Sequence, residues 1–182
     1  QSDHLYSFYS FIKMLLLDSH PIFMYFSFLD KLEVRPKIFK KLVLEELEKV
    51  KDDPDFQNLS TFKSPDHLNF RAPLSIPYFL KDNLKNKNIF HIGSRKGDLD
   101  ILFCKYAKKV ISCEIAKNIE RFHEIPNNLE YYNKDYKEII EKIIDIDIYY
   151  FWCGYEIDIL ILDDLINNHN KKGTFYITLP SD

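Results

Sequence analysis

Cysteine is scarce in this chain of 182 residues, and its three cysteines lie far apart. Cys104, Cys113 and Cys153 form no C-x-x-C pair, so the sequence indicates neither a disulfide scaffold nor a cysteine zinc site. The six histidines lack the spacing of metal ligands, and we therefore expect no metal site. Reduced, mostly buried thiols are typical of an intracellular protein, which predicts a cytoplasmic location.

The chain also lacks a large excess of charge of either sign and any long apolar run. A net charge of −3 gives no bulk electrostatic reason to bind nucleic acid. The most apolar stretch, residues 5–29, is divided by Lys13, Asp18 and His20-Pro21 into pieces too short to cross about 30 Å of hydrocarbon. Because this stretch has neither a basic start nor a small-residue cleavage site, we expect no signal peptide and no membrane association.

Apolar and aromatic side chains, by contrast, are plentiful, at 46% and 15% of the residues. This content is sufficient for one compact domain with an extension. Prolines at positions 21 and 36 can begin helices, so we predict a helical layer over residues 1–62. A Rossmann-like domain over residues 63–182 follows from the motifs described next. The aromatic-rich amino-terminal helices offer a surface for a second copy of the chain or a protein partner.

The few glycines stand where the chain must turn sharply. Residues 89–98 read as a strand, a glycine turn and the start of a helix, and residues 110–114 read as a second strand that ends in an acid. Gly93 and Gly97 permit the positive φ or close backbone approach that such a turn needs. This order predicts a Rossmann-like nucleoside site, in which the Glu114 carboxylate accepts hydrogen bonds from both ribose hydroxyls.

The spacing of the glycines separates the families that share this architecture. A G-x-G-x-x-G dinucleotide motif would need glycine at Arg95 and Asp98, and a Walker A loop would need Lys and Ser or Thr after Gly97. Instead, the run His91-Ile92-Gly93-Ser94-Arg95-Lys96-Gly97 resembles D/E-x-G-x-G-x-G, the first motif of class I S-adenosylmethionine-dependent methyltransferases. The motif is degenerate, because His91 replaces its acid and Arg95 replaces its middle glycine.

The resemblance extends over about residues 75–182. Segments 129–135, 147–152 and 172–179 are similar to the third, fourth and fifth strands of the family, and residues 156–168 read as a helix. The resemblance implies an α/β fold: a Rossmann-like, mostly parallel sheet of order 3-2-1-4-5 with a helical amino-terminal extension. The family's sixth and seventh strands have no counterpart, so we expect either a minimal or truncated version of the sheet or a sequence that stops before those strands.

The resemblance also implies S-adenosylmethionine as cofactor and names the residues that bind it. The implied cofactor-binding residues are His91, Gly93, Ser94, Gly97, Glu114, Asp135 and Trp152. Arg71 and Tyr78 are second-rank candidates at the mouth for the substrate. Methyl transfer needs no dedicated nucleophile, so we assign neither a catalytic residue nor an acceptor.

Several alternatives stay open. Asp135 is also placed to cap a helix over residues 136–144. His91 could be an interior histidine that holds the loop, and Arg95 with Lys96 could direct a phosphate-bearing nucleotide to the helix N-terminus. Finally, a methyltransferase-like fold that has lost catalysis could serve as a binding or assembly module.

Overall fold

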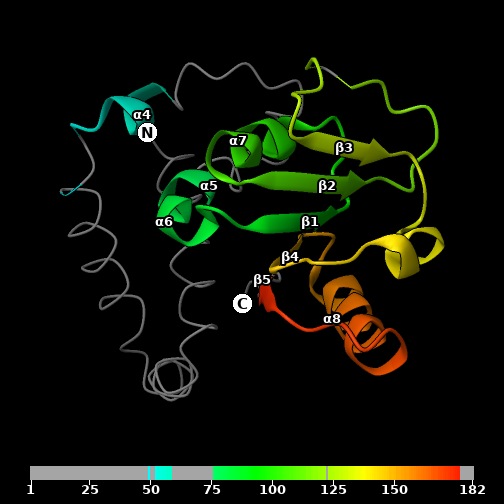
Figure 1. The fold of residues 1–182 in the computed structure, drawn as a ribbon. Helices are drawn as coiled ribbons and strands as arrows, with labels where there is room; N and C mark the ends of the chain where they lie inside the picture. Colours follow the sequence, from blue (N-terminus) through cyan, green and yellow to red (C-terminus); the bar gives the residue numbers. More distant parts are fainter. Residues whose placement is uncertain (1–48, 50–51, 59–75, 122, 177–182) are drawn as a thin grey trace, which may run out of the picture.

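A computed structural model of the chain describes residues 49, 52–58, 76–121 and 123–176. Most of the predicted helical layer and its boundary near residue 62 lie outside these described residues. The described part is built on a five-stranded parallel sheet of order β3-β2-β1-β4-β5 (Figure 1). The predicted Rossmann-like α/β fold and its strand order are therefore confirmed.

The strands are short and mostly buried. They are β1 (Asn88–Ile92), β2 (Lys109–Cys113), β3 (Leu129–Tyr132), β4 (Ile148–Phe151) and β5 (Thr174–Tyr176). The parallel register sets Ile92 beside Cys113 on one side and beside Phe151 on the other. As a result β1, β2 and β4 end at the same edge of the sheet, where parallel α/β folds place their sites.

Helices cover both faces of this sheet. On one face α7 (Asp98–Tyr106) packs with α5 (Ile76–Phe79) and α6 (Lys81–Leu84), and the ring of Phe103 lies 5.7 Å from that of His91. On the other face α8 (Tyr155–Asp163) contributes Ile161 to a core with Phe90 and Tyr149. Because successive residues of a strand point to opposite faces, His91 belongs to the α7 layer and Ile92 to the α8 layer.

A separate helix, α4 (Pro54–Asn58), is joined to the domain through the residue before it. The Tyr78 hydroxyl donates a hydrogen bond to Asp53 Oδ2 at 2.5 Å, and Lys81 Nζ lies 3.2 Å from the same oxygen. Mainly through the Tyr78 hydrogen bond, these contacts lower the pKa of Asp53 to about 2. Tyr78 is thus a buried tyrosine that anchors α4, while Arg71 lies outside the described residues.

Two segments differ from their predicted form. The helix predicted over residues 136–144 is a pair of 3-10 turns, η3 (Tyr136–Glu138) and η4 (Ile140–Lys142). Ile139, Ile140 and Ile143 are buried there, so packing of β-branched side chains outweighs a weak helix propensity. The helix predicted over residues 156–168 is α8 followed by a π-helical segment, η5 (Asp164–Asn168).

Candidate functional site

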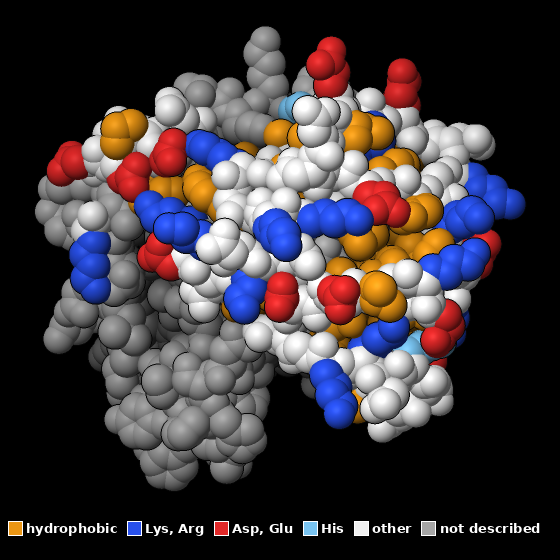
Figure 2. All heavy atoms as spheres, in the orientation of Figure 1, with side chains coloured by type: hydrophobic (Ala, Val, Ile, Leu, Met, Phe, Trp, Pro, Cys, Tyr) orange, Lys and Arg blue, Asp and Glu red, His pale blue; other side chains and the backbone are white. Residues whose placement is uncertain are grey.

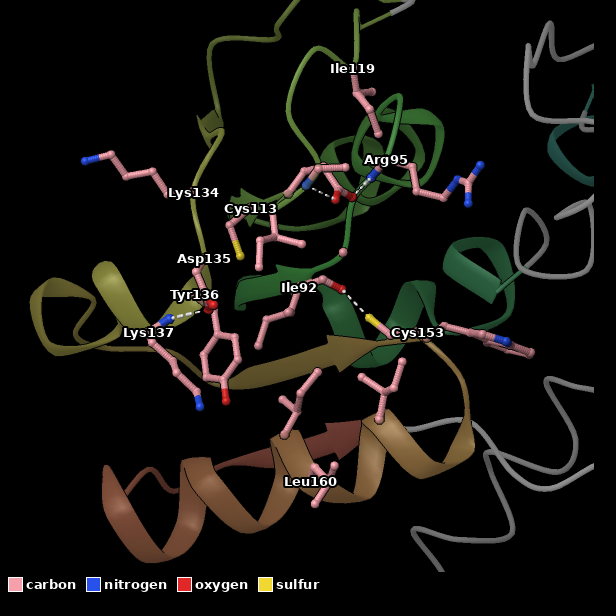
Figure 3. Close-up of a pocket in the computed structure, with 17 residues that line it drawn as sticks. Ile92, Arg95, Cys113, Ile119, Lys134, Asp135, Tyr136, Lys137, Cys153 and Leu160 are labelled. Atoms are coloured by element: carbon pink, nitrogen blue, oxygen red, sulfur yellow. Dashed lines mark hydrogen bonds between the residues drawn. The ribbon is translucent and has the colours of Figure 1, made fainter.

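A cavity of about 550 Å³ opens at the carboxyl edge of the sheet (Figure 3). It lies between the ends of β1 and β2, the turn η3, and the helix α8. Its volume is within the range of about 300–1,000 Å³ that is usual for small-molecule sites. The strand order reverses between β1 and β4 at this edge, and such a reversal is where open α/β sheets bind their ligands.

The structure brings four of the seven implied cofactor-binding residues to this cavity. Those that line it are Gly93, Glu114, Asp135 and Trp152. The other three, His91, Ser94 and Gly97, are buried and do not line it. The loop therefore has an outer side that faces the cavity and an inner side that faces α7.

Glu114 organises the outer side of the loop. Its Oε2 accepts the backbone N–H of Arg95 and its Oε1 accepts that of Ala116, each at 2.8 Å, and the residue is 6% exposed. A carboxylate offers about four lone-pair sites, so about two are left for the hydroxyls of a ligand. Arg95 has φ +47°, and the bond to Glu114 supports this left-handed conformation where the family motif has glycine.

Gly93, the residue after β1, is required by its own backbone conformation and by the close approach of the turn that follows β4. It has φ +79°, and a Cβ at this position would lie 2.7 Å from the sulfur of Cys153. The backbone N–H of Cys153 donates to Asp158, a fully buried carboxylate, at 2.8 Å. Desolvation of the sulfur, with Asp158 nearby, raises the pKa of Cys153 to about 12, so this thiol is neutral at pH 7. It is therefore a wall of the cavity and not an activated nucleophile.

Asp135 closes the side of the cavity next to β3. Its Oδ1 accepts the backbone N–H of Lys137 at 3.0 Å and caps η3, so the predicted capping role is confirmed. The next residue, Tyr136, also lines the cavity and donates from its hydroxyl to Asp164 Oδ2 at 2.6 Å. Desolvation and this hydrogen bond raise the pKa of Tyr136, and the same bond lowers the pKa of Asp164. The contact joins η3 to the end of α8.

The inner side of the loop is held by a buried polar hub, which we define as Asp100, His91, Ser112 and Arg121. Asp100 is fully buried, and its carboxylate lies 2.6 Å from His91 Nδ1, 2.8 Å from Ser112 Oγ and 2.7 Å from Arg121 Nη2. His91 thus has the interior role that we left open. Sequence reasoning missed Asp100, whose one local signal is that acids are favoured in the first turn of a helix.

Arg121 also covers the start of α7. A Cβ at Gly97 would lie 2.1 Å from Arg121 Nη2, and the guanidinium carbon stacks 4.2 Å from the centre of the Tyr131 ring. Asp98, in the first turn of α7, pairs with His123 at 2.8 Å. Side chains thus cover the helix N-terminus at which the nucleotide alternative would place a phosphate.

Comparison with known proteins gives weak likenesses to solved structures. No family model and no curated protein matches the chain. A solved structure of a candidate type II methyltransferase from Anaeromyxobacter dehalogenans has 10% identity and a TM-score of 0.45, over 58% of this chain and 46% of that one. A candidate S-adenosylmethionine-dependent methyltransferase from Listeria monocytogenes has 14% identity and a TM-score of 0.40, over 56% and 53%. A candidate RNA methyltransferase from Pyrococcus horikoshii has 18% identity and a TM-score of 0.38, over 53% and 55%.

This chain therefore spans about half the length of those structures. At such values the likenesses carry no argument about activity, and the fold stands on its own strand order and register. The described domain has a Rossmann-like α/β fold.

The residues that line the cavity of this Rossmann-like domain fit the adenosine half of S-adenosylmethionine, the cofactor that the sequence motif implies. Glu114 offers acceptors for ribose hydroxyls, and Ile92 and Ile161 supply apolar walls for a flat ring. The amino-acid half has fewer partners, because His91 replaces the motif acid and its ring belongs to the buried polar hub. The cavity therefore offers more partners to the adenosine half of the cofactor than to its amino-acid half.

No group of three or more His, Cys, Asp or Glu side chains in the described part of the chain is arranged to hold a metal ion. None of the helices described there is long and apolar enough to cross a membrane.

Proposed function

We propose that this chain binds S-adenosylmethionine in the cavity at the carboxyl edge of its sheet and acts as a methyltransferase. The observation that carries the proposal is that residues from three separate connections line one cavity. Gly93 after β1, Glu114 after β2 and Asp135 after β3 are implied by resemblance to one family, and all three line the same cavity. The parallel order β3-β2-β1 brings the connections that follow these three strands to one edge of the sheet, where open α/β sheets bind their ligands.

Each group has a definable task in such a site. Glu114 is held by two backbone N–H groups before any ligand arrives, so little reorganisation is needed for it to accept ribose hydroxyls. Ile92, Ile161 and the wall at Cys153 exclude water from one side of the cavity. When bound, S-adenosylmethionine supplies a methyl group on a sulfonium. The protein's contribution to the rate is then to position the acceptor.

Calorimetric titration with S-adenosylmethionine and S-adenosylhomocysteine tests this proposal, with NAD and ATP as controls. We expect binding of the first pair alone. Glu114→Gln removes the charge of the ribose acceptor, and a hydrogen bond to a charged group contributes about 1.5–3 kcal/mol, so affinity should fall by about tenfold or more. Glu138→Gln, an exposed residue of η3 outside the cavity, is the matched control. Absence of binding at millimolar ligand would refute the proposal.

The position of His91 favours a second candidate function, a binding or assembly module without catalysis. His91 and Asp100 are committed to each other in the buried polar hub, and neither lines the cavity. A protein that holds S-adenosylhomocysteine but transfers no label from methyl-labelled S-adenosylmethionine to any component of a cell extract would support the module. Labelling of one component that depends on Glu114 would support the enzyme.

A further inference from the structure

Large apolar side chains are exposed around the opening of the cavity. Ile115 is 66% exposed, Ile157 52% and Leu160 70%, and all three line the cavity. Ile115 follows Glu114 on one side of the opening, and the other two lie on α8 on the opposite side. We call these three residues the apolar rim. Single exposed apolar residues are ordinary, but a group that faces one cavity marks a binding surface.

The apolar rim is accompanied by basic side chains. Lys134 and Lys137 are exposed residues of the cavity lining, and within the described residues neither forms a salt bridge. In Figure 3 the ammonium of Lys134 extends outward from the cavity and that of Lys137 lies beside Tyr136. Figure 2, in which the carboxyl edge of the sheet is at the right, shows hydrophobic side chains gathered there with Lys or Arg along the border.

The two acids of the cavity lining offset only part of its positive charge. Three cationic side chains, Arg95, Lys134 and Lys137, face two carboxylates, Glu114 and Asp135, which leaves a net charge of +1, and Glu114 is only 6% exposed. The opening therefore combines exposed aliphatic surface with positive charge. That combination is complementary to a molecule with an apolar body and an anionic end.

We infer that the site binds, beside its adenosine ligand, a small amphipathic anion with an aliphatic or aryl body and one negative group. This inference rests on the proposed function, because the two ligands share one cavity. The apolar body packs against Ile115 and Leu160, and the negative group lies toward Lys134 and Lys137. An adenine ring alone does not account for the opening, because adenine is uncharged and its apolar wall is supplied at the inner end by Ile161, which is 7% exposed.

Calorimetry with three probes of equal chain length tests the ligand class: octanoate, octylammonium and octanamide. We expect octanoate to bind at least about tenfold more tightly than the other two. Leu160→Ser should weaken octanoate by about tenfold, the effect expected when a leucine side chain no longer becomes buried. Ile144→Ser is the matched control, because Ile144 is 72% exposed but does not line the cavity.

The charge requirement has its own pair of variants. Lys134→Gln combined with Lys137→Gln should bring the affinity for octanoate down to that for octanamide. Lys142→Gln, an exposed lysine of η4 outside the cavity, should leave it unchanged. Equal binding of the three probes by the unaltered protein would overturn the inference.

Repeating the octanoate titration with saturating S-adenosylhomocysteine separates this inference from the proposed function. Simultaneous binding of octanoate and S-adenosylhomocysteine supports the inference. Mutual exclusion overturns it, because the apolar rim would then be the surface that binds adenine.

If octanoate shows the expected pattern but S-adenosylhomocysteine never binds, the proposed function fails and the anion site is supported. If Leu160→Ser instead converts a dimer to a monomer in light scattering and leaves octanoate unaffected, the apolar rim is an interface between copies and the inference is overturned.

Discussion

The buried polar hub makes a quantitative prediction about Asp100. Its side chain is fully buried, and that of its partner Arg121 is 9% exposed. Asp100→Asn keeps the shape of the residue but removes the charge that compensates the guanidinium, and one donor of the new amide would face a donor of His91, Ser112 or Arg121. Breaking a buried ion pair by removing one partner costs about 3–5 kcal/mol. Since domains of this size unfold with about 5–15 kcal/mol, the variant should lose a large share of its stability.

Urea unfolding followed by the fluorescence of Trp152, the single tryptophan, measures this loss. We expect an unchanged m value and, in a thermal melt, a Tm that is about 6–20 °C lower. Asp82→Asn, at an exposed position of α6, is the control and should change stability by no more than about 0.5 kcal/mol. A loss at Asp100 below about 1 kcal/mol would refute the reasoning. So would additive losses in Asp100→Asn and Arg121→Met, because partners in one network should couple by about 0.5–3 kcal/mol.

Three further predictions concern the loop, the α4 anchor and the thiol in the wall. Gly93→Ala should destabilise the protein by about 1–2 kcal/mol from its φ of +79° alone, and Cys153→Ala should relieve only the steric part; an unchanged urea midpoint would contradict this. Asp53 has its folded pKa lowered to about 2 from 3.8, so its contribution to stability is present above pH 4 and is lost as the pH falls toward 2. The Tm of Asp53→Asn should therefore fall less between pH 5 and pH 2 than the Tm of the unaltered protein. An equal fall in both proteins would exclude this contribution of Asp53. Maleimide should label Cys153 slowly at pH 7 and about tenfold faster per pH unit, whereas a rate at pH 7 equal to or above that of free cysteine would contradict the raised pKa.

The sheet and one wall of the site could be predicted from sequence because their signals are local. Residues 89–98 show the strand, the turn and the helix start within ten positions, and Glu114 is recognisable as the acid that ends the next strand. Asp135 likewise shows its capping role within two residues. Strand order then followed from resemblance, and the structure has that order.

The inner side of the loop could not be predicted, because its partners are distant in sequence. Asp100 meets His91, Ser112 and Arg121 across separations of 9, 12 and 21 residues, and no spacing rule joins these positions. The sequence places His91 in the motif but does not indicate which face of β1 carries its side chain. Alternation along the strand decides that face, and it turns the imidazole toward α7.

The sequence of α8 carries a signal for the apolar rim, separate from the glycine motif. Residues 157–162 of α8 are Ile, Asp, Ile, Leu, Ile and Leu, so the helix is apolar on more than the stripe that a cover helix needs. Such a helix must be covered further or must expose apolar surface. Leu160, at 70% exposure, shows that the second case applies within the described part of the chain.

The two sides of the glycine loop separate stability from ligand binding. The buried polar hub fixes the loop from the α7 side without lining the cavity, and Glu114 fixes it from the cavity side through the Arg95 N–H. Asp100 variants should therefore change unfolding far more than affinity, since the loop retains its bond to Glu114 in every folded molecule. Glu114 variants should change affinity even where the fold survives, because the carboxylate is the acceptor that a ribose would use. A loop held from both sides is preorganised, so a ligand that reaches it need not supply the ordering free energy.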